Sequence, residues 1–312
     1  MTVGGERSIR GREGEDRILA EGPARIAELS AAWARTLRAE NKSPRTITAY
    51  GDSVRYLYDY LGVRGMPLAV AHIRREHVEA FILDVLETRS ASTAQTYFRH
   101  LRIFFKWAIA EGEVRESPMK HMRPPSVEER VPNVVTRAQI RALLAACTGT
   151  NGLRDRAIIL LFLDTGMRRG ELVGLRVQDI DLDHCSALVM GKGRRERVCA
   201  FGEITAAALR SYIGERIDGP LWLGERGALT AHSIPVMLRR RCEQAGIERI
   251  NAHRFRHTFA SAWLTAGGTE GDLMTLAGWR SRAMIDRYGR SAAAERARQA
   301  HARIDPLNGL LG

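Results

Sequence analysis

A proline-rich, charged segment near the middle of the chain limits most strongly how this sequence can fold. Residues 116–135, ESPMKHMRPPSVEERVPNVV, contain four prolines and no sustained apolar period. Proline does not continue a helix interior or a central strand, so such a segment favours an extended connection. The sequence therefore predicts two folded parts joined by a linker, which suits a length of 312 residues at roughly 100–200 residues per domain.

The part before the linker, residues 25–115, carries only helical patterns. Ser43-Pro44 is typical of an N-cap followed by a first-turn proline, and apolar residues then recur at helical spacing as far as Gly62. We predict a small all-helical domain here, preceded by a flexible leader over residues 1–24. Another apolar stripe runs from Tyr97 to Gly112, and three basic side chains can face away from it: Arg99, Arg102 and Lys106.

The part after the linker, residues 136–290, mixes helices with one hairpin. Thr136 and Gln139 have the spacing of a capping box at a helix start. Two short apolar runs, CSALVM and RVCAF, flank a Gly-rich basic turn with Lys192 at its tip, which is typical of a β-hairpin. Further helical patterns follow Ser233 and cover residues 251–265 and 273–288. The predicted fold class is mainly α with a small β-hairpin sheet, an α+β arrangement.

The formal net charge of +12, from 48 basic and 36 acidic residues, favours an anionic partner, although basic proteins without a polyanion also exist. No membrane span is expected, because the longest strongly apolar run, Ala157 to Leu163, is far shorter than the roughly 20 residues that cross a bilayer. The four cysteines are scattered, which favours small core residues in a reducing cytoplasm.

Cutting a DNA strand without a metal requires fixed cations for the phosphate, a nucleophile, and an acid for the leaving oxygen. The larger part holds side chains suited to these roles: Arg168, Lys192, His253, Arg256 and Tyr288. Taken singly, each has an ordinary structural interpretation. A second HxxR pair lies at His72 and Arg75, a lysine at a hairpin tip is usually solvated, and the chain has seven tyrosines.

The phrase HRFRH also places His253 and His257 at the i, i+4 separation of zinc-binding helices. Arg254 stands where the zinc motif has glutamate, and the adjacent Arg256 would repel a cation. We therefore expect no metal, and nothing in the sequence indicates another cofactor.

Five phrases occur in one order: TGMRRGEL, GKG, HRFRHTFAS, LAGWRS and RYGR. Together they resemble the tyrosine recombinase (integrase) family, whose members cut and rejoin DNA through a phosphotyrosine. The resemblance covers residues 136–290, and the helical part before them looks like the core-binding, SAM-like DNA-binding domain of that family. It implies a site-specific recombinase that acts in DNA integration, excision or resolution.

The resemblance implies a role for each matching residue. Arg168 and Arg256 would bind the nonbridging oxygens of the scissile phosphate, and Tyr288 would attack the phosphorus to form a 3′-phosphotyrosyl link. Lys192 would protonate the leaving 5′ oxygen as a general acid.

Other matching positions would support these groups. His253 would assist proton transfer at the tyrosine, while Glu171 and His257 would orient the site. Trp279 stands where family members more often have histidine; because an indole donates one hydrogen bond but does not shuttle protons, packing is its expected role. Arg290 receives no catalytic role.

The resemblance also implies partners. The first is double-stranded DNA, for which Arg99, Arg102 and Lys106 are candidate contacts. The second is the chain itself, monomeric in solution and homotetrameric in the synaptic complex. A C-terminal tail, residues 291–312, would dock on a neighbouring protomer. The expected location is cytoplasmic and nucleoid-associated, without a membrane.

The run of Arg239, Arg240 and Arg241 either lines a helix that faces a DNA groove or is simply solvated.

Two alternative functions are compatible with these residues. A type IB topoisomerase-like enzyme would share the nucleophile and the cations yet relax DNA without choosing a site. A DNA-binding regulator that does not cleave is a third possibility, and the complete set of five residues weighs against it.

Overall fold

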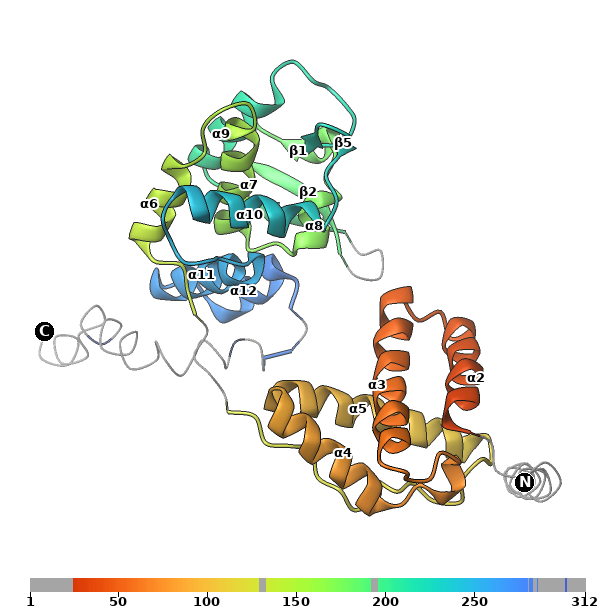
Figure 1. The fold of residues 1–312 in the computed structure, drawn as a ribbon. Coiled ribbons are helices and arrows are strands. Elements are labelled where there is room, and N and C mark those ends of the chain that lie inside the picture. Colours follow the sequence, from red (N-terminus) through yellow and green to blue (C-terminus); the bar gives the residue numbers. More distant parts are fainter. Residues whose placement is uncertain are drawn as a thin grey trace, which may run out of the picture. The chain divides into compact units, whose positions relative to one another are not determined.

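The structure, a computed structural model, describes residues 25–128, 133–191, 196–279, 281, 282, 285 and 301. The chain divides into two compact units, Met1–Glu128 and Glu129–Gly312, and the division falls inside the segment expected to be a linker (Figure 1). The expected leader, and the expected tail apart from His301, lie outside the described residues.

The first unit is helical throughout its described part, as the periodicity predicts. Side-chain caps start two of its helices: Ser43 Oγ accepts a hydrogen bond from Thr46 N at 3.2 Å, and Ser90 Oγ accepts one from Thr93 N at 3.2 Å. The elements are α2 (Ile26–Ala39), α3 (Pro44–Val63), the 3-10 turn η1 (Val70–His72), α4 (Arg75–Thr88) and α5 (Ala91–Ala110).

Helix α5 packs against α3 and α4 in the core of the first unit. The apolar side chains on its core-facing side are at most 1% exposed: Phe98, Leu101, Phe104, Phe105 and Ala108. Its other face carries the exposed side chains of Arg99, Arg102 and Lys106. The amphipathic pattern therefore predicted correctly which side of this helix is buried and which is basic.

The second unit combines helices with two small antiparallel sheets, which confirms the predicted fold class. The predicted capping box is present, because Thr136 Oγ1 accepts from Gln139 N at 3.2 Å and Thr136 N donates to Gln139 Oε1 at 3.0 Å. Its helical elements are α6 (Arg137–Ala145), α7 (Gly152–Thr165), α8 (Arg169–Val173), the 3-10 turn η2 (Val177–Asp179), α9 (Glu203–Ile213), α10 (Ser233–Gln244), α11 (Ala252–Thr265) and α12 (Glu270–Ala277).

The larger sheet has the strand order β1-β2-β3, with β1 (Ile180–Asp181), β2 (Ser186–Met190) and β3 (Glu196–Ala200). The predicted hairpin is confirmed by the pairing of β2 with β3, in which Leu188 lies opposite Val198 and Val189 opposite Arg197. Residues 192–195 between these strands, including Lys192, lie outside the described residues. A second pair of strands joins β4 (Leu223–Gly224) to β5 (Gly227–Ala228).

Helix α7 is the centre of the second unit. It is buried on nearly every side, and α9 and α11 pack against it. Helices α11 and α12 lie side by side (Figure 1). The helical pattern expected over residues 273–288 does not form one continuous helix, since α12 (Glu270–Ala277) ends before Gly278, which adopts a left-handed conformation with φ of 63°. Among the described residues, no helix has the length and apolar character needed to span a bilayer.

Substitution of Gly166 tests how tightly the end of α7 packs against α11. It ends α7 with φ of 56°, and a Cβ built there would lie 2.5 Å from Cδ1 of Phe259. We expect Gly166→Ala to destabilise the second unit by more than about 2 kcal/mol, because a left-handed alanine and an overpacked core both add cost. Urea unfolding followed by circular dichroism measures this.

Gly170→Ala is the matched control, since a Cβ there meets nothing within 4 Å. Alanine should be neutral or stabilising by up to about 1 kcal/mol at this helical position. Equal effects of the two substitutions would contradict the steric explanation.

Candidate active site

The turn between α7 and α8 presents Arg168. Gly166 ends α7, and Arg168 is then the N-cap of α8, with Glu171 at the third helical position. Arg168 N donates to Glu171 Oε2 at 2.7 Å, and Arg168 Nη1 donates to Glu171 Oε1 at 2.7 Å. The Arg168 side chain is nevertheless 45% exposed, so it is held in place and open to solvent.

Arg256 lies on α11 and is buried, with 3% of its surface exposed. Its Nη1 donates to Gly166 O at 2.6 Å and its Nη2 to Ala277 O at 2.6 Å. Its Cζ lies 5.1 Å from the ring centroid of Trp279, within cation–π range. The guanidinium is therefore fixed between the ends of α7 and α12, and Trp279, 7% exposed, packs against it.

The carboxyl end of α12 gathers three arginines. Leu276 O accepts from Arg197 Nε at 3.2 Å, Ala277 O from Arg256 Nη2 at 2.6 Å, and Gly278 O from Arg168 Nη2 at 3.2 Å. The last carbonyls of a helix have no partner within the helix and carry partial negative charge, so they attract cations. This end of α12 brings Arg168 and Arg256, far apart in sequence, to one place.

Arg197 on β3 is a member of this cluster that the sequence analysis missed. Its Nη1 and Nη2 donate to Oε1 and Oε2 of Glu171 at 3.0 and 2.8 Å. The signal was present in the alternation of the strand, because Arg197 shares the face of Cys199, and their partners on β2, Val189 and Ala187, are fully buried. An arginine at a core-facing strand position indicates an internal anionic partner.

Glu171 is the anion of the cluster. Burial raises the pKa of this carboxyl, but the hydrogen bonds from Arg197 and from the main chain and side chain of Arg168 outweigh burial and lower the pKa to about 2. The carboxylate is therefore ionised at neutral pH and holds both guanidinium groups.

The two histidines of the HRFRH phrase lie near the start of α11. Asn251 Oδ1 caps this helix by accepting from His253 N at 3.0 Å and from Arg254 N at 3.1 Å. The rings of His253 and His257 meet edge to face with centroids 4.3 Å apart, and His253, exposed, is one helical turn before Arg256. Among the described residues no cluster of three or more His, Cys, Asp or Glu side chains is arranged to hold a metal.

The predicted nucleophile Tyr288 and the predicted general acid Lys192 both lie outside the described residues, as does Arg290. The structure therefore brings together Arg168, Glu171, Arg256 and Trp279. The catalytic roles of all these residues stay predictions.

The arginine run on α10 is less uniform than its sequence suggests. Arg241 is 2% exposed; its Nε donates to Asp155 Oδ2 at 2.8 Å and its Nη1 to Ala146 O at 2.8 Å. Such burial does not suit a DNA contact, so that prediction is kept only for Arg239 and Arg240. Arg239 is 57% exposed, whereas Arg240, 47% exposed, also binds Asp155.

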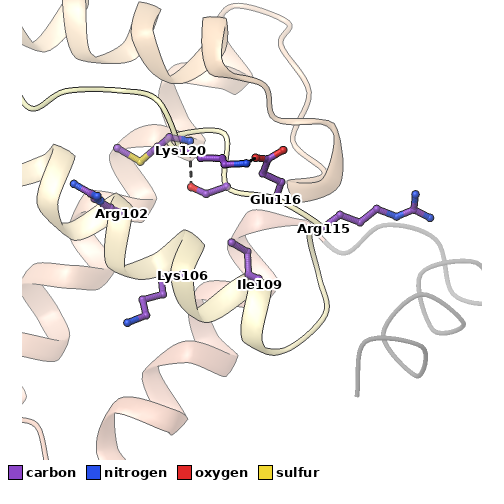
Figure 2. A pocket seen from close by; sticks show the side chains of 8 residues that line it. Arg102, Lys106, Ile109, Arg115, Glu116 and Lys120 are labelled. Carbon is purple, nitrogen blue, oxygen red and sulfur yellow. Dashed lines mark hydrogen bonds and ion pairs between the residues drawn. The ribbon is translucent and has the colours of Figure 1, made fainter. Parts of the chain in front are cut away.

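The basic face of α5 borders a pocket of about 670 Å³ in the first unit. Figure 2 shows Arg102, Lys106 and Ile109 on α5, with Glu116 and Lys120 on the segment that follows the helix. Glu116 forms an ion pair with Lys120. The pocket has a predominantly basic rim, which fits an anionic ligand group.

Comparisons with known proteins show which sequences this chain resembles. A sequence profile described as the phage integrase family matches residues 133–295, and one described as the phage integrase N-terminal SAM-like domain matches residues 29–112. Tyrosine recombinase XerC of Xylella fastidiosa (strain M23) is 30% identical over 235 residues, 72% of this chain and 79% of that protein. Tyrosine recombinase XerD of Corynebacterium glutamicum is 28% identical over 77% of this chain and 85% of that protein.

Solved structures share the fold. A lambda integrase dimer bound to a COC′ core site has a TM-score of 0.71 at 16% identity, over 88% of this chain and 79% of that one. The XerH site-specific recombinase in a post-cleavage complex with a palindromic difH substrate has a TM-score of 0.67 at 18% identity, over 84% and 81% of the two chains.

The depressed pKa of Glu171 predicts how stability varies with pH. Because the folded-state pKa, about 2, lies below the ordinary value of 4.5, ionised Glu171 stabilises the fold above about pH 4.5, and this contribution is lost as pH falls toward 2. Glu171→Gln should therefore be clearly less stable than the wild type at pH 6, and the gap should narrow toward pH 3. Urea unfolding of both proteins across this range measures the gap; a constant difference would exclude the linkage.

Proposed function

The chain belongs to the phage integrase family of tyrosine recombinases, and we propose that it is a site-specific recombinase that cuts and rejoins duplex DNA through a 3′-phosphotyrosyl link. The observation that carries the proposal is the convergence of Arg168 and Arg256 on the carboxyl end of α12. Both arginines lie in the region that matches the family. They supply two fixed cations, which phosphoryl transfer without a metal requires.

The two arginines are suited to different parts of phosphate binding. Arg168 uses one hydrogen on each terminal nitrogen for Glu171 and Gly278 O, and we propose that the second hydrogen on each nitrogen binds a nonbridging oxygen. Arg256 lies deeper, and its charge strengthens the positive potential where negative charge develops during the reaction. Because both groups are fixed before DNA binds, little reorganisation is needed.

The proposed reaction follows from the family motif. The hydroxyl oxygen of Tyr288 attacks the phosphorus while the bond from phosphorus to the 5′ oxygen breaks, and Lys192 gives that leaving oxygen its proton. His253 assists removal of the tyrosine proton. The 5′-hydroxyl of a partner strand then attacks the same phosphorus and releases the tyrosine, so the bond energy is conserved without ATP.

For DNA binding, we propose that the first unit contributes the basic face of α5. The exposed side chains of Arg102 and Lys106, together with the pocket beside them, suit the phosphates of a DNA backbone. The first unit would then be the core-binding domain, residues 25–115, and the second the catalytic domain, residues 136–290. The sequence between them, 116–135, would serve as the linker.

The assembly is also a proposal. One structure with this fold is a lambda integrase tetramer bound to a Holliday junction, with a TM-score of 0.70 at 18% identity over 85% of this chain and 80% of that one. For this chain we propose a monomer in solution that forms a tetramer on paired sites, with residues 291–312 docking on a neighbouring protomer. The cytoplasmic location follows from the same proposal.

Two experiments distinguish recombination from simple relaxation of DNA. Sequencing of recombinant junctions from cells that carry the protein identifies its site. A supercoiled plasmid with one or two copies of that site then gives recombinant circles only from the paired sites, whereas a topoisomerase relaxes every plasmid alike.

Tyr288→Phe should abolish covalent attachment to DNA, because phenylalanine lacks the attacking oxygen. A nicked suicide substrate that carries the site traps the adduct, which is measured as a shifted band after denaturing electrophoresis. Tyr58→Phe is the control and should form adducts like the wild type. Adducts from Tyr288→Phe at the wild-type level would overturn the assignment of the nucleophile, and none from the wild type would overturn the cleavage mechanism.

Lys106→Gln should weaken DNA binding by removing one phosphate contact. The plot of log affinity against log salt concentration should lose about one unit of slope. Lys42→Gln, a change at an exposed lysine of the same unit that forms an ion pair with Glu40, should leave the slope unchanged. The same slope for the wild type and Lys106→Gln would remove Lys106 from the interface.

A further inference from the structure

We propose that Arg197 is a positioning residue for strand cleavage: it fixes the Glu171 carboxylate and thereby sets the orientation and the available charge of Arg168. The inference rests on the proposed function, since it assigns to Arg168 the task of binding the scissile phosphate. Arg197 itself does not touch the phosphate in this proposal.

The geometry of the carboxylate supports a positioning role. Each oxygen of Glu171 accepts one hydrogen bond from Arg168 and one from Arg197, at distances between 2.7 and 3.0 Å. The fork of Arg197 engages both oxygens at once, which fixes the plane of the carboxylate as well as its position. Since Arg168 Nη1 donates to one of these oxygens, a rotation of the carboxylate would turn the Arg168 guanidinium with it.

Arg197 is itself fixed by hydrogen bonds from Nε and from both terminal nitrogens. Its Nε donates to Leu276 O, and its side chain is 14% exposed. A Cβ at Gly278 would lie 3.3 Å from both Cδ and Nε of Arg197, so the stem passes directly over this glycine. Arg197 therefore connects β3, α8 and the end of α12, three elements that meet at the site.

The net charge of the cluster gives a second reason to assign Arg197 a role in cleavage. A single arginine beside Glu171 would form a neutral pair, and the carboxylate would offset most of the attraction of Arg168 for a phosphate. With Arg197 present, two guanidinium groups share one carboxylate, so the cluster keeps a positive charge beside Arg256. A side chain that does not contact DNA thus strengthens the potential that the phosphate meets.

Substitutions at two arginines separate positioning from stability. Arg197→Met removes the fork and the charge, while Arg197→Lys keeps the charge but lacks the planar fork. Arg154→Met is the matched control, because Arg154 also donates two bonds to a buried carboxylate, that of Asp155, and one to a main-chain carbonyl, Leu223 O.

The readouts are the single-turnover rate of adduct formation at saturating nicked DNA, the dissociation constant for that DNA, and thermal stability. We expect Arg197→Met to slow cleavage about 10- to 100-fold with a dissociation constant within about threefold of the wild type, because the loss lies in orientation. The cleavage rate of Arg197→Lys should lie between those of Arg197→Met and the wild type. Arg154→Met should lower thermal stability and, while folded, cleave at the wild-type rate.

A double-substitution cycle with Arg168→Lys tests whether Arg197 acts through Arg168. If it does, Arg197→Met lowers the cleavage rate by a much smaller factor in the Arg168→Lys background than in the wild type. The proposal is overturned if the two losses multiply independently, if Arg197→Met cleaves at the wild-type rate, or if Arg154→Met loses the same rate. Where Arg197→Met does not fold, Arg197→Lys takes its place in the cycle with the same criteria. An absence of adducts from the wild type would instead contradict the proposed function.

Discussion

The arginine cluster of the second unit depends on where one short helix ends. Helix α12 ends at Ala277, and the carbonyls of residues 276, 277 and 278 then accept hydrogen bonds from Arg197, Arg256 and Arg168. Three guanidinium groups so close together repel one another, and a helix end with one carboxylate offsets part of that repulsion. Because this balance leaves a surplus of positive charge, the site is suited to an anion while the fold tolerates its arginines.

The positive charge of the sequence is therefore divided between surface and interior. Arg154 and Arg241 are at most 7% exposed, and each binds carboxylate or carbonyl oxygens inside the second unit. These residues add to the net charge of +12 without offering a contact to a ligand on the surface. The basic surface that an anionic partner can reach is therefore smaller than the composition suggests. It includes the exposed face of α5.

Local signals in the sequence predicted local structure well, and tertiary relations were harder to predict. The caps at Ser43 and Thr136 involve residues three positions apart, so the residues that decide them are visible together. The end of α12 depends on the conformation of Gly278, whereas the apolar period continues beyond it, which is why the helix was predicted too long. The role of Arg197 depends on Glu171, 26 positions away, and only the folded chain brings them together. The five phrases gave the family, but the geometry at Lys192 and Tyr288 lies outside the described residues.

The acceptors at the end of α12 are backbone atoms, and this has a consequence for how the protein tolerates mutation. No side-chain replacement within α12 deletes the three carbonyls, so sequence drift along this helix leaves the anchoring points in place. Displacement of the helix end, in contrast, would disturb all three arginines at once. The arrangement is thus insensitive to point changes within α12 and sensitive to displacement of its carboxyl end.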